Sequence, residues 1–400
     1  MEIIRYLTQP EKHKTRILYE AAFPEDSGPF VDYYYQWKTA DNRILVMEEE
    51  GRIQVMIHLN PYDFQICGSG WQIPYIVAVA TRPDCRRQGK MGRVMERLLQ
   101  DLEQQNCPFT ILLPADPAYY EGQGFVFFPR QNEWELPPVV SDLKAAELEW
   151  RQDTANMPEL EWKQDISDMP KPERRQDTAD MPELEWRQAK EADIAELVRL
   201  SNDILQKKSQ IFAVRDRAYY QRLLEETRVE HGGVLLLTSE EKICGILVYG
   251  LEAEEKPAAE IKELLLKLPS GEQAAEFLCQ KALPDCEISF SRPRMMFRVA
   301  SLEAFVSMLK SENPRSFTVK VRDSAVKANC GYFQITLNRE GGRLERITDS
   351  CRKIPEFRRR LDAVSSGRQE PVSEKIQEMD ISRLAVELLQ DVSLDFREWV

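Results

Sequence analysis

The chain has 400 residues, of which 42% are hydrophobic, and its 67 acidic and 54 basic residues give a net charge of −13. This length predicts roughly two to four domains, and the acidic balance argues against general binding of nucleic acid or of anionic membranes. No apolar run approaches the ~20 residues needed to span a bilayer and the first residues lack a signal-peptide pattern, so we expect a cytoplasmic protein.

The first 80 residues predict two helical segments followed by a meander of antiparallel strands. Residues 15–23 have the apolar side typical of a helix, which the stretch 24–29 ends with proline and glycine. The aromatic residues of 33–37 either pack in a core or line a substrate cleft. Short apolar segments joined by polar turns, as in β-hairpins, occupy residues 44–47, 53–59, 62–66 and 73–80. His58 lies within the second segment, where a structural histidine with its hydrogen bonds satisfied is expected.

Residues 76–93 predict a buried strand, a basic loop and the start of a helix. The helix follows from apolar residues spaced by three and four, at Met91, Val94, Met95, Leu98, Leu99 and Leu102. The loop therefore lies at a helix N-terminus, where free backbone N–H groups and the helix dipole favour an anion. Gly89 and Gly92 allow close approach to the backbone. The basic side chains of the loop are Arg86, Arg87, Lys90 and Arg93. The loop suits a phosphate ligand, although a basic turn without a ligand has the same pattern.

Two motifs of this region resemble the GCN5-related N-acetyltransferases (GNAT superfamily). The first, Arg86-Arg-Gln-Gly89, is similar to the family's pyrophosphate motif Gln/Arg-x-x-Gly-x-Gly/Ala, with the second small residue at Gly92 rather than at Met91. The second, Tyr120-Glu-Gly-Gln-Gly-Phe125, is similar to the family's Tyr-x-x-x-Gly-Phe segment and follows a predicted strand at 109–113. Their order along strand, helix, strand and loop matches that fold.

A twelve-residue repeat separates this region from the rest of the chain. Residues 147–158 recur as 159–170, in degenerate form as 171–182, and begin again at 183–188. Each full copy ends in proline, which interrupts a continuous helix. We interpret the repeat as a charged linker. The tryptophans Trp150, Trp162 and Trp186 leave a binding array as the alternative.

The remainder of the chain predicts two further α/β regions. Residues 189–285 contain a helix near 194–200, a hairpin of 234–238 with 243–249, and a strand near 259–266, but nothing similar to the basic loop. Residues 286–400 open with 295–305, continue with strands at 317–321, 331–337 and 344–348, and include a helix at 381–389. This layout, with its Arg-Val-x-x-Leu-Glu-Ala-Phe segment, resembles Eis-type (enhanced intracellular survival) acetyltransferases, which end in a sterol-carrier-protein-like domain.

The resemblance implies an α/β (α+β) fold with two tandem GNAT-like mixed-sheet domains and a sterol-carrier-protein-like α+β domain. The expected divisions are 1–140 for the catalytic domain, 141–188 for the linker, 189–285 for a second GNAT-like domain without a CoA motif, and 286–400 for the last domain.

The resemblance also implies which residues hold acetyl-CoA and act on it. Tyr120 occupies the general-acid position, with Tyr119 as the fallback, and the carboxylate of Val400 would be the base, with Glu25 or Asp26 as alternatives. The strand backbone would bind the pantetheine arm and the loop the pyrophosphate. These cofactor-binding positions are Val79, Ala80, Thr81, Arg86, Arg87, Gln88, Gly89, Lys90, Met91 and Gly92.

The leading hypothesis is an acetyl-CoA-dependent N-acetyltransferase that transfers acetyl directly to a primary amine of a cationic small molecule or a lysine side chain. The family implies a homo-oligomer, and the acidic net charge predicts no nucleic-acid or membrane partner. A non-catalytic CoA- or ligand-binding regulatory protein is the alternative, and a preference for longer acyl groups also stays open. Eight scattered cysteines without a Cys-x-x-Cys pair, and only three histidines, predict neither a disulfide framework nor a metal site. Cys85, beside the basic loop, is expected to be a packing residue rather than a catalytic thiol.

Overall fold

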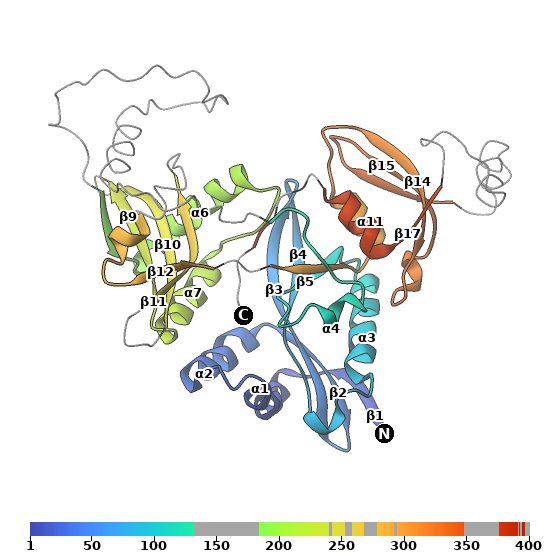
Figure 1. Ribbon diagram of the computed structural model, residues 1–400, viewed down its shortest axis with the longest axis horizontal. Coiled ribbons are helices and arrows are strands. Elements are labelled where there is room, and N and C mark those ends of the chain that lie inside the picture. Colours follow the sequence, from blue (N-terminus) through green and yellow to red (C-terminus); the bar gives the residue numbers. More distant parts are fainter. Residues whose placement is uncertain are drawn as a thin grey trace. The chain divides into compact units, whose positions relative to one another are not determined.

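The computed structural model describes residues 1–131, 184–239, 242–252, 258–267, 278–291, 294–347, 376–390, 392 and 394–396 (Figure 1). The chain forms two compact units. The first comprises Met1–Asn132, Lys208–Val214 and Pro293–Val400, and the second comprises Glu133–Lys207 and Arg215–Arg292. The repeat interpreted as a linker lies outside the described residues up to position 183. Its last copy enters a strand at Leu184, so the predicted linker ends earlier than expected.

The first unit is built on a mixed sheet with the order β1-β2-β3-β4-β5-β13-β6. Its first four strands are antiparallel, which confirms the predicted hairpin and meander, whereas β4 and β5 are parallel. The segments 53–59 and 62–66 belong to one long strand rather than two. The strands are β1 (Glu2–Tyr6), β2 (Arg43–Glu49), β3 (Arg52–Ile66), β4 (Ser69–Thr81), β5 (Phe109–Leu112), β13 (Met296–Val299) and β6 (Val126–Phe127).

Helix α3 (Lys90–Gln104) covers one face of this sheet, and α1 (Arg16–Ala22) with α2 (Gly28–Trp37) covers the other (Figure 1). The predicted apolar stripe of α3 is buried and packs on the odd-numbered residues of β3, including Val55 and Ile57. Alternation along the strand turns the even-numbered residues, such as His58, toward α1 and α2. Each buried apolar side chain contributes roughly 1.5–3 kcal/mol. Packing therefore holds the start of α3 against the sheet.

Three strands join this sheet from distant parts of the sequence. β13, predicted to open the last domain, lies between β5 and β6 instead. β8 (Ile211–Ala213) pairs with the end of β3, and β18 (Leu394–Asp395) pairs with β8. Sequence periodicity missed these pairings because backbone N–H and C=O groups at a sheet edge accept any strand. Sheet membership thus does not follow the predicted divisions at 140, 188 and 285.

The second unit repeats the strand connectivity of the first. Strands β7 (Leu184–Gln188), β9 (Gly233–Ser239), β10 (Lys242–Glu252) and β11 (Ala258–Leu266) are antiparallel in that order, and β12 (Glu287–Phe290) then pairs parallel with β11. The helices α6 (Ile194–Lys208) and α7 (Arg217–Val229) lie between β7 and β9 in the sequence. The same antiparallel series followed by a parallel pair occurs in β1–β5. Tandem mixed sheets were predicted, and this fold class is confirmed.

A smaller sheet belongs to the first unit and has the order β16-β15-β14-β17. Its strands are β14 (Arg315–Arg322), β15 (Gly331–Leu337), β16 (Gly342–Arg346) and β17 (Gln377–Asp380). The helices α9 (Leu302–Met308) and α11 (Ile381–Leu388) come from the same region of the chain. This region is α+β, as predicted, and its likeness to sterol carrier proteins stays a prediction. Within the described ranges, no helix is long and apolar enough to cross a membrane.

Candidate functional site

Strand β4 separates from β5 just before the basic loop. The two strands pair only at Tyr75 and Ile76, so on that side residues 77–81 have no strand partner among the described residues. On the other side, a bulge places two residues of β4 opposite Ile57 of β3. Ala78 lies in this bulge with φ +48°, an unusual backbone for a residue other than glycine. The result is a free backbone edge formed by Val77 to Thr81.

The free edge leads through η3 (Pro83–Cys85) into the loop that starts α3. Arg87 and Gly89 have φ of +59° and +69°, and these two left-handed residues curve the loop. The first three N–H groups of α3 have no acceptor within the helix. From Arg87 to Gly92, no backbone N–H donates to a described residue. Six consecutive amides are therefore available at a helix N-terminus, as an anion site requires.

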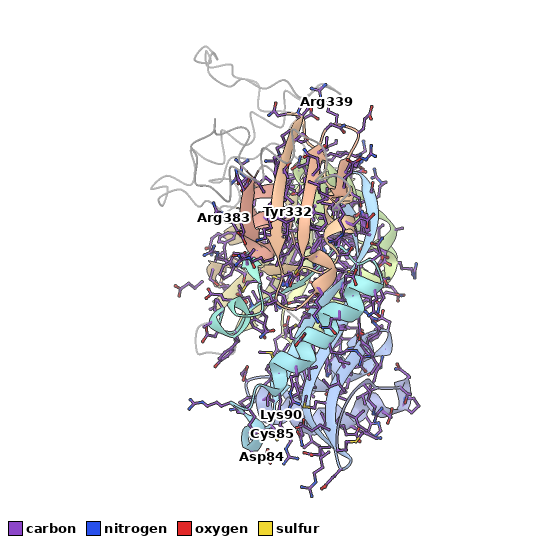
Figure 2. All side chains as sticks on the ribbon, turned by 90° about the vertical axis from the view of Figure 1, so that its right-hand side faces the viewer. Asp84, Cys85, Lys90, Tyr332, Arg339 and Arg383 are labelled. Carbon is purple, nitrogen blue, oxygen red and sulfur yellow. The ribbon has the colours of Figure 1, made fainter. Side chains whose placement is uncertain are left out.

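The side chains of the loop divide into free and engaged groups. Arg87 is exposed and has no ion pair with another described residue, and Arg86 donates only from Nε to the carbonyl of Thr81, at 3.2 Å. Gln88 donates to the carbonyl of Asp84 at 3.1 Å. Figure 2 shows Asp84, Cys85 and Lys90 together at the N-terminal end of α3. The cationic side chains that an anion would meet there are thus Arg86 and Arg87.

Lys90 does not present its ammonium to the loop, which corrects one part of the prediction. Its Nζ lies 2.8 Å from a carboxylate oxygen of Glu2 and also donates to Gln54. Arg93 donates to the other Glu2 oxygen at 2.7 Å, and these two bonds lower the pKa of Glu2 to about 2. Glu2 was not considered because its strand, β1, was not predicted. Lys90 can therefore contribute only its backbone N–H to an anion site.

Tyr120 is buried in the core beneath α3. It lies in the short helix α4 (Ala118–Glu121), and its ring packs edge-on against Phe125 in the core beneath α3. Burial raises the pKa of Tyr120 to about 12, and its hydroxyl forms no hydrogen bond with a described residue. Tyr119, in contrast, is 64% exposed. Only the first of the two tyrosines lies in an enclosed environment.

The segment that follows Tyr120 contacts the start of α3 directly. A Cβ built on Gly92 would lie 3.3 Å from Nε2 of Gln123. The loop amides and the Tyr120 segment, predicted from two separate motifs, are therefore neighbours in the fold. This proximity is what a single site would need.

The opposite face of the sheet carries a buried cluster of aromatic rings. Tyr34 shares a hydrogen bond of 2.9 Å with Nδ1 of His58, whose Nε2 has no partner in the described chain. Burial lowers the pKa of His58 to about 3, so the ring is neutral. Tyr19 packs on Tyr34 and donates to Asp26 at 2.7 Å. These aromatic residues pack as a core. His58 is buried within it, but only one of its two ring nitrogens is hydrogen-bonded to a described residue, whereas the sequence predicted a histidine with both satisfied.

The end of the described chain returns to this same face. The ring of Phe396 packs on Tyr62, Phe64 and Tyr75, with centroid distances of 5.2–5.3 Å. Tyr75 lies two residues before the free edge of β4. Val400, expected to supply a base, lies outside the described residues.

No cluster of three His, Cys, Asp or Glu side chains in the described portion could hold a metal ion. Cys85 is buried beside the loop.

Comparisons with known proteins concern the family and the fold. Residues 3–128 match the family model of the acetyltransferase (GNAT) domain. A search of curated protein sequences found no match.

Three solved structures illustrate the likeness over the whole chain. A probable N-acyltransferase from Enterococcus faecalis is 13% identical, with a TM-score of 0.66 over 97% of this chain and 90% of that one. A GCN5-related N-acetyltransferase from Anabaena variabilis is 13% identical, with a TM-score of 0.64 over 96% and 89%. Eis1 from Mycobacterium abscessus is 10% identical, with a TM-score of 0.58 over 97% and 89%. At these identities the likeness concerns the fold alone.

Proposed function

We propose that the GNAT domain is an acetyl-CoA-dependent N-acetyltransferase that passes acetyl directly to a primary amine of a cationic small molecule or a lysine side chain. The observation that carries the proposal is the free edge of β4, which leads through η3 into six consecutive amides at the start of α3 that have no acceptor among the described residues. An extended polyamide can add to such an edge as an extra strand. A pyrophosphate fits the helix N-terminus.

The residues proposed to hold acetyl-CoA act mainly through the backbone. Val79, Ala80 and Thr81 would hydrogen-bond the pantetheine arm. Arg86 and Arg87 would add charge-assisted bonds to the pyrophosphate oxygens. The backbone amides proposed to surround those oxygens belong to Arg87, Gln88, Gly89, Lys90, Met91 and Gly92.

Tyr120 is proposed to act on the departing sulfur. The amine nitrogen attacks the thioester carbonyl, the C–S bond breaks, and negative charge develops on sulfur. A phenol with a pKa of about 12 stays protonated and can donate to that sulfur. Because this value lies about 3.5 units above that of an ordinary thiol, the chemistry favours a stabilising hydrogen bond over complete proton transfer to the thiolate.

The amine must also lose a proton, and the terminal carboxylate of Val400 is the proposed acceptor. Four residues follow Phe396 and span at most about 14 Å. Measured from Tyr75, this length covers the start of the free edge, from Val77 to Val79, but not its end at Thr81, which lies about 20 Å along the strand. Adding one glycine after Val400 would shift the carboxylate by about 3.5 Å. A lower kcat is then expected, whereas an unchanged kcat would remove Val400 from the mechanism and favour Glu25 or Asp26.

Calorimetric titration with acetyl-CoA tests the proposed function. The unaltered chain should bind, and Gly89→Val should weaken binding at least tenfold because its side chain strains the φ of +69° and obstructs the amides. Arg97→Met is a matched control, since Arg97 lies on α3 but pairs with Asp101. No heat at tens of micromolar acetyl-CoA would remove the proposal. Binding without acetylation of any amine would favour the regulatory alternative.

The homo-oligomer implied by the family resemblance forms part of the same proposal. Light scattering on the unaltered chain tests it, and a monomer at assay concentration would contradict it.

A further inference from the structure

The segment that carries Tyr120 is packed on one side and open on the other. Tyr120 and Phe125 face the core beneath α3. Residues 121–127, except Gln123, also border a pocket of about 550 Å³ that touches β13, β14 and α11. Close packing therefore does not hold the backbone of residues 121–127 on the pocket side. Directed contacts must fix its position there.

Val126 and Phe127 pair with β13, and Arg298 of the same strand contacts the segment at Gln123. The Arg298 side chain is 1% exposed, and Nε donates to the carbonyl of Gln123 at 2.8 Å. Gly124 has φ +84°, and a Cβ at that position would lie 2.7 Å from the same nitrogen. Only glycine leaves room for the guanidinium here. The glycine of the Tyr-x-x-x-Gly-Phe motif thus admits an arginine from a segment about 170 residues away in sequence.

The guanidinium of Arg298 is held rigidly by its remaining bonds. Nη1 donates to the carbonyl of Val299 at 2.6 Å, and Nη2 donates to Asp323 at 2.5 Å. Asp323 also accepts from Asn329 and from the backbone N–H groups of Ala325 and Val326. Burial acts to raise the pKa of Asp323, but the neighbouring Arg298 charge and these hydrogen bonds outweigh it, and the pKa is lowered. The buried pair is therefore charged, and its guanidinium is fixed in place.

Ser382 of α11 makes a second, weaker contact. Its hydroxyl donates to the carbonyl of Gly124 at 3.0 Å. Two consecutive carbonyls of the Tyr120 segment are thus held by residues that lie after position 293 in the sequence. The same segment contacts Gly92 at the start of α3 through Gln123.

We propose that Arg298 is a positioning residue for Tyr120, and that the region after residue 293 completes the active site of the GNAT domain through it. This inference rests on the proposed function. Arg298 holds the carbonyl of Gln123, and through it the backbone that places the Tyr120 hydroxyl relative to the loop of α3. It does not touch the reacting atoms. If loss of this contact displaces the Tyr120 hydroxyl by about 1 Å, turnover is expected to fall by up to about a hundredfold.

Two variants of Arg298 test the proposal. Arg298→Lys keeps a positive charge beside Asp323. Its single side-chain nitrogen cannot bond to the carbonyls of Gln123 and Val299 and to the Asp323 carboxylate at the same time. Arg298→Met combined with Asp323→Asn removes both charges together, so neither is left buried and unpaired. Arg322→Met is the matched control, because Arg322 lines the same pocket but is exposed and pairs with Glu378 rather than with the segment. Melting temperatures establish that each variant is folded.

Both variants should lower kcat by about tenfold to a hundredfold and leave the Kd for acetyl-CoA within twofold. The amides of Gln123, Gly124 and Phe125, which donate within the turn, should exchange hydrogen at least tenfold faster. The control should change neither quantity. Folded variants with unaltered kcat, or with unaltered exchange at these amides, overturn the proposal. The hydrogen-exchange measurement does not depend on enzymatic turnover. If the variants exchange these amides faster, as expected, but the unaltered chain acetylates no amine, the proposed function is wrong and the contact made by Arg298 is not.

Discussion

Replacing Tyr120 by phenylalanine isolates the role of one hydroxyl group. That hydroxyl has no hydrogen-bond partner among the described residues, so its removal leaves no protein group unsatisfied. The free energy of unfolding should change by less than about 1 kcal/mol. Removing one donor from an enclosed site typically lowers kcat by about 10²–10³-fold, or about 2.7–4 kcal/mol in the barrier. We therefore expect a large loss of turnover in a stably folded variant.

The pKa of Tyr120 sharpens this prediction. At about 12, only about one molecule in 10⁴ carries a phenolate at pH 8. Ionisation of Tyr120 should therefore leave kcat constant on the alkaline side up to about pH 10. A tyrosine with an ordinary pKa of 10 would already reduce kcat by about half at that pH.

Steady-state release of free thiol from acetyl-CoA is the assay, with a diamine, a polyamine and a lysine-containing peptide as acceptors. Calorimetry measures the Kd for acetyl-CoA in parallel. Tyr119→Phe is the matched control, because the ring of Tyr119 is exposed. This variant should keep full activity. A Tyr120→Phe protein with unaltered kcat would refute the role. A tenfold loss of acetyl-CoA affinity instead would show that Tyr120 packs beneath the cofactor.

Three further predictions follow from buried or paired groups. The two basic partners of Glu2 hold its pKa at about 2, below the ordinary 4.5, so their contribution to stability is complete above about pH 4.5 and declines as the pH falls toward 2. The difference in urea midpoint between the unaltered chain and Glu2→Gln should accordingly shrink from pH 7 to pH 3, and a constant difference would contradict the pairing. His58 has a pKa of about 3 when folded, against 6.5 when unfolded. Its neutral form therefore stabilises the fold above pH 6.5, and on the order of 4 kcal/mol is lost by pH 3.5. Denaturation of His58→Gln should depend less on pH over this interval, and an equal dependence would place the titrating group elsewhere. Gly124→Ala combines a φ of +84° with a contact to Arg298 and should cost about 1–3 kcal/mol. A melting temperature equal to that of the unaltered chain would mean that the segment relaxes freely.

Local patterns predicted much of the structure of residues 3–128, because helix periodicity and glycine-containing turns depend on residues that are close together in the sequence. The spacing of Val94, Leu98 and Leu102 requires one buried helix face, and the structure buries that face. The glycines and arginines of 86–92 likewise predicted amides at a helix start, which the structure leaves unpaired. The order of the two motifs predicted the fold class.

Contacts between residues distant in the sequence were decided only by the tertiary structure. No pattern near Lys90 indicates that Glu2 and Gln54 draw its ammonium away from the loop, because that pairing needs β1 and β3 beside α3. Strand β4 separates from β5 after Ile76 and bulges against β3 at Ala78. The positive φ of Ala78 could not be predicted from the sequence, because alanine rarely adopts it.

The same limit explains Arg298. The Arg-Val-x-x-Leu-Glu-Ala-Phe segment that begins at Arg298 is recognisable in the sequence. The role proposed for Arg298, however, depends on β13 lying between β5 and β6. Backbone hydrogen bonds join strands without regard to side-chain identity, so the sequence alone could not state which strand fills that place. The sequence by itself determined the helix, the loop and the position of Tyr120. The tertiary structure decided which distant groups hold them.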